Sequence, residues 1–134
     1  MGRIKLDNRR SVCPVACALE IFGDAWTLIV IRDLACGKTQ YKELSGGHEG
    51  ISTNILADRL RRLVELGLVE KFRTSELPGR DQYRLTPRGY SLGPIISDIA
   101  EWGLKHITGT KALLRPDFRR GLNTSKMQAG IRGN

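Results

Sequence analysis

The fold is decided by residues 52–86, STNILADRLRRLVELGLVEKFRTSELPGRDQYRLT. From Ser52, which suits a helix N-cap, apolar residues return at helical spacing until Gly67. Beyond that glycine the period becomes two, and a proline-glycine turn separates the stretches 68–74 and 82–86. The sequence therefore predicts a helix that is followed directly by a β-hairpin.

The two-residue period predicts which side chains of the hairpin share a face. In the first strand, Phe72 is expected on one face, with Lys71 and Arg73 on the other. In the return strand, Gln82 and Arg84 are expected opposite the two apolar residues. A basic hairpin of this kind is typical of a wing.

Three helices are predicted before this stretch, over residues 13–22, 25–36 and 39–45. Pro14 suits the first turn of the first helix, and Asp24 is an N-cap candidate for the second. The second helix is apolar nearly all round, so it is expected at the centre of the core.

One long helix is predicted after the hairpin, over residues 86–107, with a kink at 93–94 where glycine precedes proline. Beyond the kink, Ile95, Ile99 and Trp102 recur on one face. This apolar stripe is expected to pack against another surface, either a second subunit or the rest of the chain.

Length and charge indicate one small domain with basic ends. The 134 residues carry a net charge of +8, but residues 11–110 contain twelve basic and twelve acidic side chains. We divide the chain into a basic arm (1–11), a domain (12–107) and a basic, flexible tail (108–134). No apolar run approaches the ~20 residues that cross a bilayer, and no signal-peptide pattern is found. We expect a cytoplasmic protein with no membrane contact.

The order of elements predicts a mainly α fold with a small β-hairpin, a winged helix-turn-helix. An α-helix fits the major groove of DNA, with its first turn at the base edges. Residues 59–88 contain eight basic and four acidic side chains, which favours a polyanionic partner. In the second helix of the motif, Ser52, Thr53 and Asn54 occupy the first turn, and Arg59, Arg61 and Arg62 are within reach of phosphates. In the wing, the cationic side chains are Lys71, Arg73, Arg80 and Arg84.

Two other classes of function fit the sequence less well. A winged helix also serves as a protein-interaction module without DNA readout, but its exposed face should then be acidic or apolar. An enzyme ranks last, because the sequence has no paired catalytic carboxylates, no Ser/His/Asp set and no phosphate-binding glycine motif.

The three cysteines are expected to be thiols in a reducing cytoplasm. Cys13 precedes a helix N-terminus and lies near Arg9 and Arg10, so the helix dipole and the two cations favour its thiolate. A disulfide between Cys13 and Cys17 and a disulfide between subunits are equally open. A further alternative is that all three cysteines are small buried apolar residues. No metal site or cofactor is predicted, because no ligand spacing repeats.

The sequence resembles the HxlR family of prokaryotic regulators, which is related in fold to the MarR type. The resemblance covers about residues 12–107. The segments that carry it are Cys13-Pro14, Ala18-Leu19-Glu20, Trp26-Thr27-Leu28, Tyr41-Lys42-Glu43-Leu44, Gly50-Ile51-Ser52, Leu60-Arg61-Arg62-Leu63, Gly67-Leu68-Val69, Tyr83-Arg84-Leu85-Thr86-Pro87-Arg88-Gly89 and Trp102-Gly103.

The resemblance implies a homodimeric regulator, expected to be a repressor, whose two recognition helices read a pseudo-palindromic operator. Base readout would fall on Ser52, Thr53, Asn54 and Asp58, and backbone contacts on Arg59 and Arg62. Lys42 is a further candidate for a backbone contact, together with the cations of the wing. The subunits would meet through the first and last helices, with Val15, Leu19, Ile95, Ile99 and Trp102 at the interface.

The resemblance further implies that Cys13, with Cys17, senses an oxidant or an electrophile; a small molecule is the other effector expected. One feature departs from the family pattern. His48 and Glu49 stand where such sequences have an apolar residue and a proline, which leaves the packing of this turn open.

Overall fold

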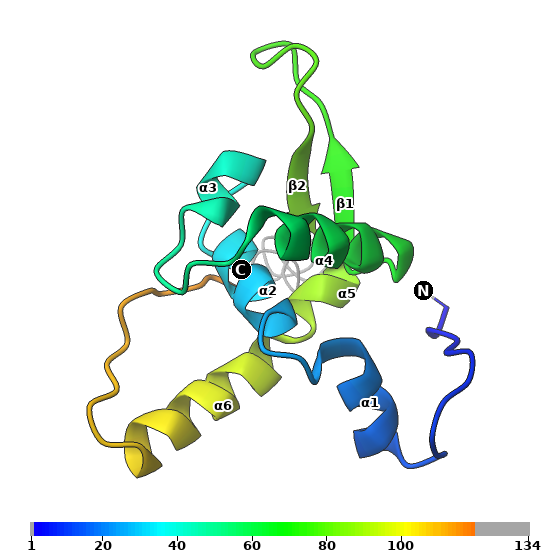
Figure 1. Cartoon of the computed structure of the whole chain (residues 1–134), viewed down its shortest axis with the longest axis vertical. Coiled ribbons are helices and arrows are strands. Elements are labelled where there is room, and N and C mark those ends of the chain that lie inside the picture. The colour runs from blue at the N-terminus through cyan, green and yellow to red at the C-terminus, as the bar shows by residue number, and fades with distance from the viewer. Residues whose placement is uncertain (1, 120–134) are drawn as a thin grey trace, which may run out of the picture.

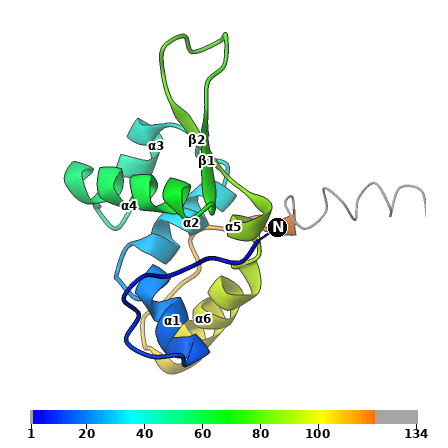
Figure 2. The same ribbon diagram turned by 90° about the vertical axis from the view of Figure 1, so that its right-hand side faces the viewer.

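The computed structural model describes residues 2–119, and these form six helices and a two-stranded antiparallel sheet (Figure 1). The elements in chain order are α1 (Pro14–Phe22), α2 (Thr27–Ala35), α3 (Tyr41–Ser45), α4 (Thr53–Glu65), β1 (Val69–Phe72), β2 (Gln82–Leu85), α5 (Pro87–Tyr90) and α6 (Gly93–His106). The hairpin projects from one end of the molecule, and α1 and α6 lie at the opposite end (Figures 1 and 2). The predicted winged helix-turn-helix is confirmed.

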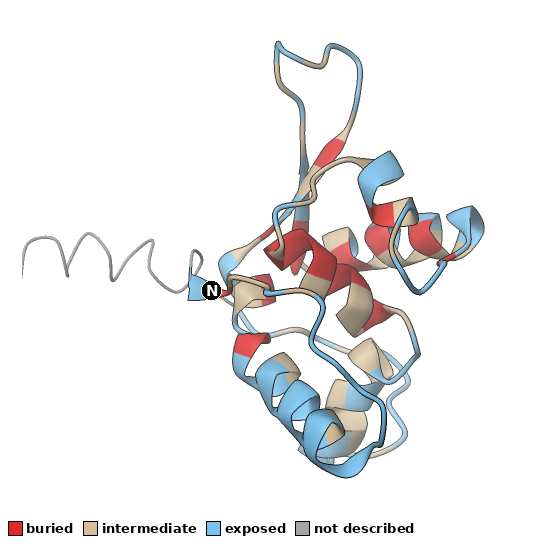
Figure 3. Ribbon diagram, turned by 90° about the vertical axis from the view of Figure 1, so that its left-hand side faces the viewer, coloured by how far each residue is buried: buried red, intermediate tan, exposed pale blue. Residues whose placement is uncertain are grey.

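The hydrophobic core lies between α2, α4 and the base of the hairpin, where the buried residues gather in Figure 3. Helix α2 is central as predicted, with Ile31 fully buried. Helix α4 contributes Leu56, Leu60 and Leu63, at the spacing that keeps one helix face inward. Burial of this apolar surface is the main source of the stability of the domain.

Helix α2 begins two residues later than predicted, at Thr27 rather than Ala25. The carboxylate of Asp24 accepts hydrogen bonds from the backbone N–H of Trp26 (3.0 Å) and of Thr27 (3.1 Å). Asp24 therefore satisfies free N–H groups at the helix start, although it lies two positions before the N-cap, Trp26.

The predicted alternation of the hairpin is present, but Gln82 is buried, at 7% exposure. The reason is a neighbouring segment, because Gln40 forms a β-bridge to Gln82. The side-chain oxygen of Gln82 also accepts a hydrogen bond from the Thr39 hydroxyl (3.0 Å). Residues 39–40 thus extend along β2, and α3 starts at Tyr41 rather than at Thr39.

The long helix predicted after the hairpin is two helices, α5 and α6, with a break at residues 91–92. Pro94 has no N–H to donate to the carbonyl of Tyr90, so a continuous helix would lose a hydrogen bond there. The prediction of one kinked helix was therefore wrong, because the helix is interrupted here rather than bent. The break lets α6 leave the core and carry its apolar residues away from it (Figure 1).

The segment after α6 returns to the core, so the predicted flexible tail begins too early. Phe118 is 9% exposed and meets the ring of Tyr90 edge to face, with centroids 6.5 Å apart. The backbone N–H of Asp117 donates to the carbonyl of Ala35 (2.9 Å). A Cβ atom at Gly93 would lie 2.6 Å from Cβ of Phe118. The rest of the predicted tail, 120–134, lies outside the described residues.

The basic arm runs past α1 before the chain enters that helix (Figure 2). Arg10 forms an ion pair with Glu20 of α1 (2.5 Å). The division of the chain into arm, domain and tail otherwise stays a prediction.

Among the described helices, none is by itself long and apolar enough to cross a bilayer. Helices α1 and α2 reach that length and composition only as a pair, which is bent by 72°.

Candidate nucleic-acid interface

The outward face of α4 starts with the solvent-exposed first turn of the helix. Ser52 caps this terminus by accepting a hydrogen bond from the N–H of Ile55 (3.3 Å). Thr53 and Asn54 are exposed in the first turn. The Tyr41 hydroxyl donates to the carbonyl of Thr53, so α3 fixes the position of this turn. Two short polar side chains and the unpaired backbone N–H groups of the first turn therefore face the solvent together.

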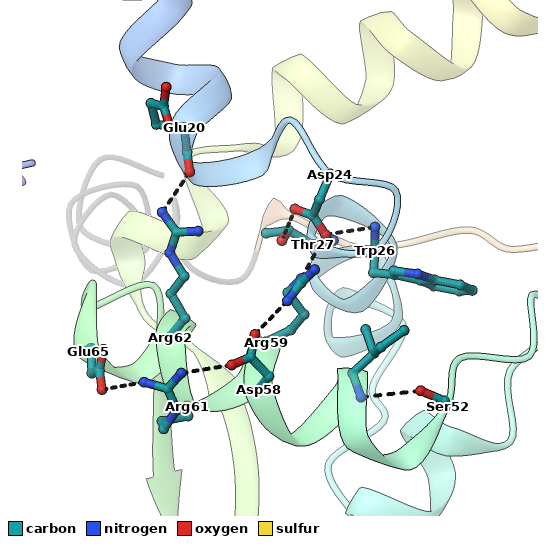
Figure 4. A network of polar contacts seen from close by, with 11 residues as sticks. Glu20, Asp24, Trp26, Thr27, Ser52, Asp58, Arg59, Arg61, Arg62 and Glu65 are labelled. Carbon is teal, nitrogen blue, oxygen red and sulfur yellow. Dashed lines mark hydrogen bonds and ion pairs between the residues drawn. The ribbon is translucent and has the colours of Figure 1, made fainter. Parts of the chain in front are cut away.

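Further along this face, Arg61 lies between two carboxylates. Its guanidinium is 2.8 Å from Asp58 and 2.9 Å from Glu65 (Figure 4). The hydrogen bond that Arg61 donates to Asp58 is the main cause that lowers the pKa of Asp58, and it is also the main cause that raises the pKa of Arg61. All three side chains are solvent-exposed, so these pairs are weak and can exchange partners.

Arg59 and Arg62, assigned above to the DNA backbone, point away from this face (Figure 4). The guanidinium of Arg62 donates to the backbone carbonyl of Glu20 at the end of α1 (2.6 Å). Arg59 lies 2.8 Å from Asp24 and 2.5 Å from Asp58. The two arginines flank the buried leucines of α4, which places them against the neighbouring elements, and we no longer assign them to the interface.

The contact of Arg59 with Asp24 joins α4 to the start of α2. Partial burial opposes ionisation of Asp24, but hydrogen bonds from Thr27, Arg59 and the Trp26 N–H lower its pKa to about 2. Asp24 is therefore charged at neutral pH and links the start of α2 to Arg59 in the middle of α4.

The turn between α3 and α4 is fixed by an ion pair in place of the proline of the family pattern. Glu49 accepts two hydrogen bonds from Arg32 of α2, of 2.8 and 3.0 Å. Arg32 also contacts the buried carboxylate of Asp33 (2.7 Å), which in turn meets Lys38 (3.3 Å). His48 is exposed beside this network. The packing that the sequence left open is thus supplied by Arg32.

The wing carries its cations on both faces of the ribbon. Lys71 and Arg73 share Asp81, at 3.8 and 2.8 Å, and the hydrogen bond from Arg73 is the main cause that lowers the pKa of that carboxyl. On the other face, Arg84 pairs with Glu70 and lies over the ring of Phe72, 4.3 Å from its centroid.

The loop at the tip of the wing exposes Arg80, and Lys42 is exposed on α3. Positive charge therefore extends from α3 to the tip of the wing, on the side of the molecule that carries the start of α4 (Figure 1).

The two cysteines proposed as sensors lie at the start of α1. Cys13 is exposed and is the N-cap, and the backbone N–H groups of Ala16 and Val15 are the main causes that lower the pKa of its thiol. The Cys17 thiol donates to the carbonyl of Ser11 (3.2 Å). Burial, in contrast, raises the pKa of Cys36. All three thiols are free.

The five residues predicted at a subunit interface are exposed on α1 and α6. Their exposed fractions are Val15 66%, Leu19 46%, Ile95 39%, Ile99 51% and Trp102 60%. The single chain therefore does not bury the apolar stripe of α6.

Sequence reasoning underrated Arg61, which belongs to the outward face, and missed Ala57, exposed one turn after Thr53 and Asn54. The helical period alone identifies both residues once the three buried leucines define the inner face. The sequence predicted no metal ligands. Within residues 2–119, no three His, Cys, Asp or Glu side chains lie close enough together to hold a metal ion.

Comparison with known proteins relates the chain to bacterial regulators. The HxlR-like helix-turn-helix family matches residues 21–111. An uncharacterized HTH-type transcriptional regulator of Mycobacterium tuberculosis (strain CDC 1551 / Oshkosh), MT3179, is 38% identical over 102 residues. That match covers 76% of this chain, which thus spans 64% of the length of the mycobacterial protein.

Two solved structures of regulators are similar. The transcriptional regulator YodB from B. subtilis, in its reduced form, has a TM-score of 0.62 at 26% identity and covers 75% of this chain and 100% of its own. The redox regulator HypR, in its reduced form, has a TM-score of 0.65 at 28% identity, with 72% of this chain and 95% of its own covered.

These findings set aside the enzyme class, because the matching family and the relatives named here are transcription regulators. The chain belongs to the HxlR-like helix-turn-helix family of transcription regulators.

Proposed function

We propose that the chain is a repressor that binds a pseudo-palindromic operator as a homodimer. The observation that carries this proposal is the exposed first turn of α4, the helix that leads directly into an exposed, cationic wing (Figure 1). A helix end and a basic ribbon on one side suit a major groove and the adjacent backbone. Two copies of this surface, related by a two-fold axis, would match a palindromic site.

Within this proposal, Asn54 and Thr53 read base edges, with Ser52 as the cap that orients them. Amide side chains bond adenine in two places, and short hydroxyls tolerate either base. Asp58 favours a cytosine amino group and Arg61 a guanine or a phosphate, after each releases the other.

The backbone contacts fall on the cations of α3 and the wing. These residues are Lys42, Lys71, Arg73, Arg80 and Arg84. The carboxylate partners of Lys71, Arg73 and Arg84 are exposed or partly exposed, so phosphate oxygens can replace them.

We propose that the second subunit covers the exposed apolar residues of α1 and α6. Ile95, Ile99 and Trp102 recur at i, i+4 and i+7, which is the spacing of one helix face. Exposed apolar patches of this kind on a small protein commonly mark an interface. The two helices lie at the end away from the wing, which leaves both recognition helices open (Figures 1 and 2).

We propose that the effector is an oxidant or electrophile that acts on Cys13. The thiol is exposed and its pKa is lowered, which are the two conditions for reactivity. It lies beside the helix proposed for dimerisation, so its modification would alter the geometry of the dimer. The similarity to HypR, a redox regulator, supports this assignment.

The cytoplasm, with association to the nucleoid when DNA is bound, is the proposed location, because it holds both the DNA and the reducing environment that keeps thiols free.

Binding to DNA from upstream of the chain's own coding sequence tests the proposal. At fixed salt, the reduced protein should form a specific complex that Asn54→Ala and Arg61→Ala weaken, each by about 1–3 kcal/mol for a base contact. Arg10→Ala, which removes an arginine from the arm, is the control and should bind as the wild type does. Absence of specific binding would favour the protein-interaction module.

Mild oxidation tests the thiol switch in the same assay. The wild type should lose DNA affinity and the Cys13→Ser variant should keep it. Equal binding of the reduced and oxidised wild type would leave the regulator in place and remove the switch. A non-reducing gel distinguishes a Cys13–Cys17 disulfide within one chain from a disulfide between subunits.

A further inference from the structure

A cavity of about 290 Å³ lies between α2, the turn before α4, α6 and the returning segment 110–116. Its volume is at the lower end of the range for small-molecule sites. Ile96, Ala100 and Leu104 of α6 face Leu113 and Leu114 of the segment across it. The apolar part of the site therefore suits an aliphatic chain or one ring.

The polar end of this cavity has more positive than negative groups. Arg32, Lys111 and Glu49 line it, together with His48. Lys111 is exposed and has no ion-pair partner within residues 2–119. An open apolar groove with a cationic end fits an amphipathic anion.

Arg32 also connects the cavity with the recognition helix. Of its two carboxylate partners, Asp33 is buried, with 4% side-chain exposure, and is also held by Lys38. Glu49 is 38% exposed and belongs to the turn that ends at Ser52, the cap of α4. Glu49 is therefore the partner that an incoming carboxylate can replace.

We propose that this cavity binds a small carboxylic acid with an apolar tail, whose carboxylate takes the place of Glu49 on Arg32. The turn before α4 then loses its side-chain anchor to α2. The first turn of α4 is thereby less well held, and DNA affinity falls. The effect on DNA rests on the proposed function, whereas the binding site does not.

Calorimetric titration of the full chain with sodium octanoate, without DNA, tests the site. Octanoate, used below its micelle-forming concentration, should bind at least about tenfold more tightly than 1-octanol, which lacks the charge. Equal binding of the two compounds, or no binding of octanoate, would overturn the proposal and leave DNA binding untouched.

The Gly103→Leu variant locates the site. Gly103 lines the cavity, and a Cβ atom there meets no other atom within 4 Å, so a larger side chain can start from this position and extend into the cavity. The variant should fold, as judged by thermal unfolding, and lose octanoate binding. Unchanged binding would overturn the assignment of the cavity.

The exchange of partners is tested by Glu49→Gln and Arg32→Gln. Octanoate should bind several-fold more tightly to the first variant, because its competitor is gone, and about tenfold less tightly to the second. The Arg10–Glu20 pair lies outside the cavity, so Arg10→Gln and Glu20→Gln are matched controls that should bind as the wild type does. Unchanged affinity in Glu49→Gln would refute the exchange.

In the presence of DNA, octanoate should weaken operator binding by the wild type, and Glu49→Gln should already bind weakly and respond little. Octanoate that binds without any change in DNA affinity would refute the coupling.

Discussion

Replacement of Phe118 by alanine should destabilise the domain strongly, although this residue lies in a stretch whose sequence is typical of a flexible tail. Phe118 is 9% exposed, packs directly on Gly93 and meets Tyr90 edge to face. It therefore fills the space at the break between α5 and α6. Removal of the ring would open a cavity there.

The magnitude follows from this burial. Phenylalanine to alanine in a core costs about 3–5 kcal/mol, and we expect about 3 because the ring lies near the edge of the core. A domain of this size is stable by about 5–15 kcal/mol. A loss of about 3 kcal/mol lowers the melting temperature by about 10–15 °C. A solvated tail residue would change it by close to zero.

Urea unfolding of the wild type and the variant at one protein concentration measures the difference. Leu113→Ala is the control, because that side chain is 62% exposed, and it should change the stability little. Gly93→Ala alone should also destabilise, since its Cβ would overlap Cβ and Cγ of Phe118. Alanine at position 118 keeps the Cβ atom, so the double variant should be less stable than either single variant. A loss below about 1 kcal/mol for Phe118→Ala would refute the packing described above.

Three further predictions concern the contacts of α1, α2 and α4. Arg62→Met should lower the free energy of unfolding by about 1–3 kcal/mol, because the hydrogen bond to the Glu20 carbonyl is lost. DNA binding by the folded protein should stay the same, and weaker DNA binding at unchanged stability would contradict this. Asp24, whose pKa is lowered to about 2 from 3.8, should stabilise the fold above its unfolded pKa and lose this effect as the pH falls through its folded pKa. The gap in stability between wild type and Asp24→Asn, followed by acid titration, should accordingly narrow from about pH 4 to pH 2, and a constant gap would refute the role. Iodoacetamide at neutral pH should label Cys13 before Cys36, as mass spectrometry of the peptides would reveal, and the reverse order would oppose the assignment.

The elements of the fold could be predicted because their signals are local. Ser52 caps α4 as expected, and the change from helical period to alternation after Gly67 marks the start of the hairpin. The places where prediction was wrong depend on contacts between distant segments. Gln82 is buried because residue 40 pairs beside it, and no pattern within the strand records that neighbour.

The candidate site could be predicted only in part. The first turn of α4 and the wing cations are exposed as expected. Arg59 and Arg62, in contrast, contact other parts of the same chain, namely Asp24 and the carbonyl of Glu20. A count of basic residues cannot tell an arginine that reaches a phosphate from one that bonds a backbone carbonyl. Phe118 was missed for a similar reason, since an isolated aromatic residue after an irregular stretch carries no period.

The carboxylates beside Arg61 have a consequence for how DNA binding depends on salt. Each cation that binds a phosphate releases counterions from DNA, so affinity falls with salt in proportion to the number of such contacts. Arg61, Arg73 and Arg84 already hold carboxylates of the protein, namely Asp58 and Glu65, Asp81 and Glu70. When they turn to phosphates, these acids stay near the duplex and take up cations from solution. The salt dependence of binding should therefore be shallower than the number of arginines on this surface implies.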